Sequence, residues 1–309
     1  MLLIGDIGGT NARLALAEPG TTNPVEERRY ATADFRDFAS VLAAYLADTR
    51  ATITAGCLAV AGPIGDNGRS ARLTNLPWSI DADALEARFG IGRLTLANDF
   101  AAAAMGVTVA PAESIVPLQD GEPLLRAPRL VIGAGTGLGM AVLAWQHDGW
   151  EVLPGEGGHV GFAPLDDDQE RVWRALKTEH GRVTCERVIS GPGLAAIHRI
   201  LAGGELDPAA ITRRALADGD AASRRSINVF LGAYGAYAGD MAMAVMARGG
   251  VYLAGGIAAR LLPLLPASPF LDAFNAKAEH AELARRMPVA VATDDVLGLR
   301  GAACLAATG

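Results

Sequence analysis

Short apolar runs and glycine-rich breaks alternate at the start of the chain. Residues 2–5 are apolar up to a glycine and predict a short buried strand, while residues 12–17 predict a returning strand with partial alternation. The segment between them, residues 6–11, contains two glycines and predicts a tight turn. These three segments together predict a hairpin.

The same pattern occurs again in the middle of the chain, with a different spacing. Residues 130–133 predict a strand, residues 134–137 a glycine turn with a threonine, and residues 138–145 a second strand. A third strand, at residues 251–253, ends in a pair of glycines and leads into a helix that begins near Ile257. The chain therefore contains two similar hairpins and one glycine-ended strand.

Helical spacing of apolar positions marks several longer segments. Residues 35–48 predict a helix for which Asp34 is available as N-cap. Residues 220–247 are rich in Ala and Met, and the part from 227 onward could be a core helix or part of a dimer face. Further helices are predicted at 166–178, 193–202 and 296–307, and strands at 52–60 and 94–97. Alternation of strands and helices indicates an α/β fold.

The length of 309 residues favours two domains with a ligand-binding cleft between them, because one hydrophobic core usually stops growing below this size. Prolines and a glycine interrupt regular structure between residues 107 and 127, where we place the boundary. We expect a smaller α/β domain of residues 1–108 with 297–309, and a larger α/β domain of residues 109–296.

Charge and cysteine content limit the partners and the compartment. A formal net charge of −7 argues against nucleic acid or an anionic membrane as the main partner, because both require a basic surface. Cys57, Cys185 and Cys304 are odd in number and far apart, so neither a disulfide framework nor a cysteine zinc site is expected. We expect a reducing compartment.

The start of the chain does not resemble a signal peptide, because it lacks a basic region and reaches an acidic residue at Asp6. Its longest apolar stretches are interrupted by Gly, Pro or Arg248, which leaves no run of about 18 residues that could cross a bilayer. The expected location is the cytoplasm, with no membrane partner.

Two common phosphate-binding motifs are missing. A P-loop requires Gly-Lys before Ser or Thr, and the sequence contains no Gly-Lys pair. A dinucleotide fingerprint requires a third glycine and a following helix, whereas Gly133 and Gly135 are followed by Leu138 and a predicted strand. Glycine hairpins remain, since their backbone N–H groups can approach phosphate oxygens closely.

In the first hairpin, Asp6 and Asn11 offer oxygen atoms suited to a hydrated Mg²⁺ ion, which keeps several water ligands. Taken singly, each hairpin is better explained as an ordinary tight turn, because turns are the commonest use of such residues. Two glycine–threonine hairpins together with a Gly-Gly strand end favour nucleotide binding.

The three glycine segments, residues 5–13, 133–137 and 253–257, resemble the two phosphate motifs and the adenosine motif of the actin, Hsp70 and hexokinase superfamily. The resemblance implies two ribonuclease H-like domains that flank an ATP cleft. It also implies that the ATP-binding residues are Gly5, Asp6, Gly8, Gly9, Thr10, Asn11, Gly133, Gly135, Thr136, Gly137, Gly255 and Gly256, with Asp6 holding Mg²⁺ through water.

Polar residues at three places suit a ligand with several hydroxyl groups. Asn98 and Asp99 follow an apolar strand, where ligands of open α/β sheets collect. Glu156 and His159 lie in a glycine-rich loop, and Glu186 precedes another turn. These side chains accept or donate hydrogen bonds as a sugar requires.

Each of these residues also has a purely structural explanation. Asp99 could be a helix N-cap, His159 a surface histidine and Glu186 a solvated charge. Asp166 and the two acidic residues after it are expected to form a solvated helix start, and the other four histidines are expected at the surface.

The sequence as a whole resembles bacterial glucokinases, since the segments 5–13, 73–78, 97–100, 155–164, 186–194 and 255–257 occur in the order of that family. The resemblance implies glucose contacts for Asn98, Asp99, Glu156, His159 and Glu186, with Asn75 close to the same pocket. The cysteine-rich zinc motif of the related repressor and open-reading-frame kinase family is absent, so no zinc is expected.

The implied reaction transfers phosphate from ATP to the 6-hydroxyl of glucose, with Mg²⁺ as cofactor, Asp99 as general base and a homodimer as the expected assembly. Another hexose kinase, for mannose, fructose, glucosamine or an N-acetylhexosamine, remains an alternative, and ADP or polyphosphate remains open as donor. A chaperone-like ATPase or a sugar-responsive regulator is a further alternative. A regulator would need a DNA-binding helix-turn-helix, for which we expect no room before Gly5.

Overall fold

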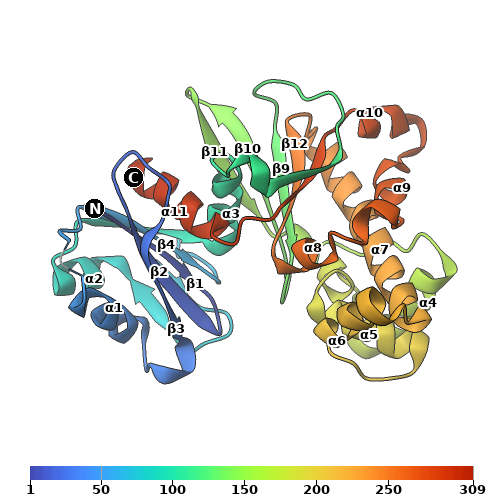
Figure 1. Cartoon of the computed structure of the whole chain (residues 1–309), viewed down its shortest axis with the longest axis horizontal. Coiled ribbons are helices and arrows are strands. Elements are labelled where there is room, and N and C mark those ends of the chain that lie inside the picture. The colour runs from blue at the N-terminus through green and yellow to red at the C-terminus, as the bar shows by residue number, and fades with distance from the viewer. Residues whose placement is uncertain (50, 309) are drawn as a thin grey trace. The chain divides into compact units, whose positions relative to one another are not determined.

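A computed structural model of the chain describes residues 1–49 and 51–308, which divide into two compact units (Figure 1). Unit 1 comprises Met1–Ala112, Trp150–Pro154 and Asp294–Gly309, and unit 2 comprises Glu113–Gly149 and Gly155–Thr293. Each unit is a mixed α/β structure built on its own sheet, which confirms the predicted α/β class. The division into residues 1–108 with 297–309 and residues 109–296 stays a prediction.

Unit 1 is built on a five-stranded sheet of order β3-β2-β1-β4-β7. Its strands are β1 (Leu2–Ile7), β2 (Asn11–Ala17), β3 (Val25–Ala31), β4 (Ala55–Val60) and β7 (Arg93–Asn98), beside a small ribbon of β5 (Ser70–Arg72) and β6 (Ser79–Asp81). Strand β1 is antiparallel to β2 and parallel to β4, and β4 is parallel to β7. The predicted first hairpin is confirmed.

Both faces of this sheet are covered, which explains why β1 is a continuous apolar run. Leu3 faces a core formed with Phe38, whereas Ile4 faces Leu299 on the other side. The helices of unit 1 are α1 (Phe38–Ala47), α2 (Ala82–Phe89), α3 (Asp99–Val107) and α11 (Leu297–Thr308), with a 3₁₀ turn at Thr32–Asp34 and another at Ala112–Ser114.

The predicted N-cap of the first helix is wrong. Asp37 caps α1 by accepting a hydrogen bond from Ser40 N at 2.8 Å, while Asp34 lies in the preceding 3₁₀ turn. The apolar spacing locates the helix but does not select among several nearby acidic residues, because all of them are good N-caps.

Helices α3 and α11 touch through backbone atoms, because glycine lets them approach. A Cβ atom on Gly301 would lie 1.7 Å from the carbonyl oxygen of Ala102, and one on Gly106 would lie 2.1 Å from that of Leu297. Glycine at these two positions therefore fixes the placement of α3, the helix that begins at Asp99.

The second sheet has the strand order β11-β10-β9-β12-β13-β8. Its strands are β8 (Ile115–Gln119), β9 (Arg129–Ala134), β10 (Leu138–Gln146), β11 (Gly149–Gly155), β12 (Gly250–Ala254) and β13 (Val289–Ala292). The first five strands in this order, β11 to β13, repeat the strand arrangement of the sheet in unit 1. In both sheets an antiparallel hairpin is followed by two strands that are parallel to the first strand of the hairpin. The repeat noted in the sequence is therefore a repeat of topology.

Strand β8 is the one strand that this plan adds, and it lies at an edge of the sheet. It contains Pro117, although we expected the prolines of residues 107–127 to interrupt regular structure. Proline cannot donate a ladder hydrogen bond, and an edge strand tolerates this loss on its open side.

The long apolar stretch forms α7, a core helix of unit 2. Its residues from Ser226 to Gly239 are mostly buried, and Tyr234 donates a hydrogen bond to the Ile132 carbonyl at 3.2 Å. Helix α7 spans Ala221–Val245, and the other helices of unit 2 are α4 (Asp167–His180), α5 (Gly191–Ala202), α6 (Pro208–Arg213), α8 (Gly256–Leu261), α9 (Phe270–Asn275) and α10 (Ala281–Arg285). Short turns occur at Gly157–His159, Cys185–Arg187, Arg214–Asp218, Leu265–Ala267 and Ala278–His280.

Two polar expectations in unit 2 have opposite outcomes. Asp166 caps α4 by accepting from Gln169 N at 2.8 Å, which confirms the predicted helix start. His198 is only 4% exposed and its Nδ1 lies 3.0 Å from the Ser226 hydroxyl, so its predicted surface position is wrong. Within residues 1–49 and 51–308, no helix is both long and apolar enough to cross a membrane.

Candidate active site

The first glycine turn joins β1 to β2 and is supported from behind by Thr32. The N–H of Gly8 donates to Asn11 O at 2.9 Å and closes the turn. The hydroxyl of Thr32 donates to Gly9 O at 2.8 Å, and the Thr32 N–H donates to Thr10 O at 3.0 Å. Because Thr32 is only 3% exposed, this support comes from the interior of unit 1.

Asp6 lies on β1 just before this turn, in register with Arg13 of β2. Burial raises the pKa of the Asp6 carboxyl above its usual value, although Arg13 and Arg29 act in the opposite direction. The ionised carboxylate is therefore incompletely stabilised by its protein neighbours. A hydrated Mg²⁺ ion would supply the missing charge, so the residue fits the predicted role.

A metal held at Asp6 would keep most of its water ligands. Among residues 1–49 and 51–308, no group of three or more His, Cys, Asp or Glu side chains gathers in a way that could hold a metal ion. Mg²⁺ is commonly bound in this manner, by one or two carboxylates together with phosphates and water.

Asn98 and Asp99 lie where β7 passes into α3. The side chain of Asn98 is the N-cap, since its Oδ1 accepts from Phe100 N at 3.0 Å and from Ala101 N at 3.3 Å. Asp99 is the first residue of the helix, and its Oδ1 accepts from Phe100 N at 2.8 Å. The alternative that Asp99 serves as the N-cap is therefore wrong, because Asn98 fills that position.

Sheet register places this corner near the first glycine turn. Ile7 at the end of β1 and Asn98 at the end of β7 both pair with Val60 of β4, one on each side. Two strand spacings correspond to roughly 10 Å. Asn75, an exposed residue between β5 and β6, is also close, since a Cβ atom on Gly9 would lie 3.0 Å from its Cβ.

The second glycine turn joins β9 to β10 and is held by the segment that leads into α5. Within the turn, Gly135 N donates to Gly137 O at 2.8 Å. From outside, Gly191 N donates to Gly135 O at 2.8 Å, and Leu138 N donates to Oε2 of Glu186 at 2.9 Å. Glu186 therefore lies against the turn and is not simply a solvated charge.

Glu156 and His159 lie on a loop beside β10, the strand that follows the second glycine turn. Their side chains are 89% and 59% exposed, and His159 Nε2 is 3.9 Å from Oε2 of Glu156. The loop is tied to the Glu186 turn, because Cys185 N donates to Val160 O at 2.9 Å. The start of β10 thus brings three of the predicted sugar ligands of unit 2 together.

The Gly255–Gly256 pair ends β12 and begins α8. Gly255 has φ +85°, a backbone conformation that favours glycine. A Cβ atom there would lie 3.1 Å from the carbonyl oxygen of Ala134, so this pair borders the second glycine turn. The predicted adenosine and second phosphate motifs are neighbours within unit 2.

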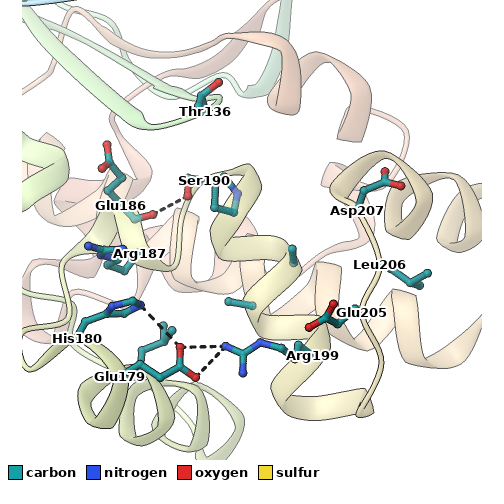
Figure 2. A pocket seen from close by; sticks show the side chains of 14 residues that line it. Thr136, Glu179, His180, Glu186, Arg187, Ser190, Arg199, Glu205, Leu206 and Asp207 are labelled. Carbon is teal, nitrogen blue, oxygen red and sulfur yellow. Dashed lines mark hydrogen bonds and ion pairs between the residues drawn. The ribbon is translucent and has the colours of Figure 1, made fainter. Parts of the chain in front are cut away.

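A pocket of about 640 Å³ opens beside the second turn and runs along α5 (Figure 2). Thr136 lies at one end and Glu186 and Ser190 at its side, while Arg199 and Asp207 lie further along. Ser190 was not among the predicted site residues. Its signal was the sequence Ser-Gly-Pro-Gly, since Ser is a favoured N-cap and Pro is favoured in the first helical turn.

A sequence model described as glucokinase matches residues 3–309. The chain belongs to the glucokinase family. The glucokinase of Yersinia pestis (strain Pestoides F) is 37% identical to this chain over 306 residues, which cover 97% of this chain and 94% of that relative. The chain is thus an enzyme of this family, and the family resemblance predicted from the motifs is confirmed.

Solved structures of glucokinases share the fold over the whole chain. The glucokinase from an Antarctic psychrotroph has a TM-score of 0.87 and 31% identity, with 100% of this chain and 99% of that chain covered. A ROK family glucokinase from Streptomyces griseus, solved in complex with glucose and AMPPNP, has a TM-score of 0.69 and 20% identity, with 99% and 100% covered. The predicted actin-like ATPase fold is confirmed.

The predicted site residues lie in both units. Unit 1 contains Gly5, Asp6, Gly8, Gly9, Thr10, Asn11, Asn75, Asn98 and Asp99, and unit 2 contains Gly133, Gly135, Thr136, Gly137, Glu156, His159, Glu186, Gly255 and Gly256. Within each unit they gather at the glycine turns and at the strand ends beside them.

Proposed function

We propose that this glucokinase family member transfers the γ-phosphoryl group of ATP to the 6-hydroxyl of glucose with Asp99 as general base. The observation that carries this role is the position of Asp99. It is the first residue of α3, at the end of a strand two positions across the sheet from the first glycine turn. A carboxylate there is near a predicted phosphate-binding turn without being part of it.

In the proposed reaction, Asp99 accepts the proton of the 6-hydroxyl as that oxygen forms a bond to the γ-phosphorus and the bond to ADP breaks. Asn98 keeps its side chain on the helix N-terminus and so holds the backbone from which Asp99 projects. Glycine-turn N–H groups stabilise the phosphate oxygens. Mg²⁺, when bound near Asp6, neutralises part of the phosphate charge.

We assign the sugar to Asn75, Asn98 and Asp99 in unit 1 and to Glu156, His159 and Glu186 in unit 2. The exposure of Glu156 and His159, which face each other at 3.9 Å, supports a role toward a ligand. AMPPNP is an ATP analogue, and the complex of the Streptomyces griseus relative with glucose and AMPPNP supports ATP as the donor.

The test is the substitution Asp99→Asn, with Glu156→Gln as the matched carboxylate-to-amide control. Asn cannot accept the proton, so we expect kcat to fall by about 10²–10⁴-fold while glucose binding stays measurable. Glu156→Gln should mainly raise KM for glucose. Near wild-type turnover of Asp99→Asn in a coupled assay would refute the assignment.

Substrate choice is tested by the same assay across several hexoses and phosphate donors. We expect glucose and ATP to give the highest kcat/KM among glucose, mannose, fructose, glucosamine and N-acetylhexosamines, and among ATP, ADP and polyphosphate. A higher kcat/KM for another hexose would replace glucose as the proposed substrate.

We also propose that the enzyme works in the cytoplasm, where ATP and glucose meet, and that it is a homodimer as the family resemblance implies. Light scattering on the purified protein checks the dimer.

We also propose a domain division into residues 1–108 with 297–309 and residues 109–296. Limited proteolysis near residue 109 would test this division.

A further inference from the structure

Gly137 in the second glycine turn lies directly against the carboxylate of Glu186. A Cβ atom added to Gly137 would be 2.5 Å from Oε2 of Glu186 and 3.3 Å from its Cδ. Apart from its two chain neighbours, no other heavy atom of residues 1–49 and 51–308 would lie within 4 Å of that Cβ. The space that the missing side chain leaves is therefore used by one carboxylate.

Backbone conformation does not explain the glycine. The φ angle of Gly137 lies outside the left-handed range, so an alanine would not be strained there for backbone reasons. Gly135, two residues earlier in the same turn, also has an ordinary φ, and a Cβ atom on it would meet nothing within 4 Å in the described part of the chain other than its two chain neighbours. The two glycines of one turn thus differ in what a methyl group would contact.

Glu186 is held at two places, its side-chain carboxylate and its backbone carbonyl. Oε2 of Glu186 accepts from Leu138 N at 2.9 Å, and the Glu186 carbonyl accepts from the Ser190 hydroxyl at 2.7 Å. Ser190 is 2% exposed and accepts from Gly193 N at 3.1 Å, so it joins Glu186 to the first turn of α5 (Figure 2). The Ser190 bond thus fixes the backbone of Glu186 and the Leu138 N–H fixes its carboxylate, so displacing the carboxylate from Leu138 N changes the position of the side chain.

We propose that Gly137 is a positioning residue for sugar binding, which acts by leaving room for Glu186 on the N–H of Leu138. This inference rests on the proposed role of Glu186 as a sugar ligand. A residue within the predicted phosphate turn then affects the affinity for the sugar. The second glycine turn and Glu186 are therefore structurally coupled.

The experiment compares Gly137→Ala with Gly135→Ala by calorimetry, using glucose without nucleotide and ADP without sugar. Gly137→Ala should weaken glucose binding about tenfold, which corresponds to about 1.4 kcal/mol. It should change ADP affinity less than twofold, because alanine keeps the backbone N–H through which the predicted phosphate turn would act. Gly135→Ala should do the reverse, because its methyl group enters the open side of the turn where phosphate is expected.

A second pair of variants shows that the effect passes through Glu186. In the Glu186→Ala background the Gly137→Ala change should no longer alter glucose affinity, because the carboxylate that it displaces is gone. An equal loss of glucose affinity in both backgrounds would overturn the inference. So would a loss of ADP affinity by Gly137→Ala as large as its loss of glucose affinity.

Failure of the proposed function is recognised separately with Glu186→Gln, which keeps the shape and can still accept from Leu138 N. Unchanged glucose affinity in this variant would remove Glu186 from the sugar site. Weakened affinity in Glu186→Gln with none in Gly137→Ala would overturn the positioning role alone and leave the sugar contact intact.

Discussion

The two glycine turns occupy equivalent places in their sheets, but the carboxylate beside each turn comes from a different part of the chain. The first turn follows β1, and Asp6 on that strand supplies a carboxylate of its own. The second turn follows β9, where Ala134 stands between Gly133 and Gly135, and its carboxylate comes from Glu186, 48 residues away from Leu138. One topology therefore carries two chemical arrangements.

The difference indicates a division of roles. A carboxylate whose pKa is raised by burial is suited to a cation, because the cation replaces the solvent that burial removes. A carboxylate that accepts a backbone hydrogen bond, as Glu186 does from Leu138, keeps a fixed orientation suited to hydroxyl groups. The first turn is thus suited to the metal, and the second to connecting phosphate and sugar.

Among the substitutions that test the difference between the two turns, Asp6→Asn is expected to have the largest effect on activity. Loss of the carboxylate should lower kcat by about 10–100-fold, as for outer-shell metal partners, and should raise the Mg²⁺ concentration needed for half-maximal rate. A Mg²⁺ titration of the rate measures this. An unchanged Mg²⁺ dependence would contradict the role of the first turn.

The same substitution should stabilise the protein at neutral pH. A raised folded-state pKa means that the ionised Asp6 costs stability, fully so above that pKa, and the cost disappears below the ordinary value of 3.8. The thermal midpoint of Asp6→Asn should therefore exceed that of the wild type at pH 7, and the difference should shrink as the pH is lowered.

Ser190→Ala tests the second turn and should have an intermediate effect. It removes the cap of α5 and the hydrogen bond to the Glu186 carbonyl, at a cost of about 1 kcal/mol in stability. Because Gly191 N also bonds Gly135 O, KM should rise for both glucose and ATP. A rise in KM for ATP alone would mean that Ser190 does not connect Glu186 to the second glycine turn.

Thr32→Val tests the first turn and should have the smallest effect. Val keeps the shape but loses the hydrogen bond to Gly9 O, at a cost of about 0.5 kcal/mol in stability. KM for ATP should rise severalfold in steady-state kinetics, with KM for glucose unchanged. An equal rise in both constants would mean that the two turns do not differ as described.

Local patterns in the sequence predict the hairpins, the long helices and the fold class, because each depends on residues near one another. They do not predict β3, which lies at a sheet edge. Its central residues, Glu-Glu-Arg-Arg, are mostly exposed, so the strand lacks the apolar pattern of a buried strand. The sequence offered Asp99 as a helix N-cap, whereas the hydrogen bonds show that Asn98 fills that position.

The contacts that distinguish the two turns lie beyond such patterns. Thr32 is 23 residues from Gly9, and Glu186 is 48 residues from Leu138. No periodicity or spacing marks these partners, since their pairing depends on how strands and helices pack in three dimensions. Glycine turns and polar positions in the sequence indicated most of the sugar and nucleotide residues, the family resemblance supplied their roles, and those roles stay predictions.

The packing of α3 on α11 has a consequence for synthesis on the ribosome. Residues 113–293 lie between these two helices in sequence, although both belong to unit 1. At about 5–20 residues per second, α3 waits roughly 10–40 s for the helix that fixes it through Gly301 and Ala102. During that interval α3 has its contacts with β4 and β7 but lacks those with α11, so we expect the helix that carries the proposed base to reach its final position only after α11 has been made.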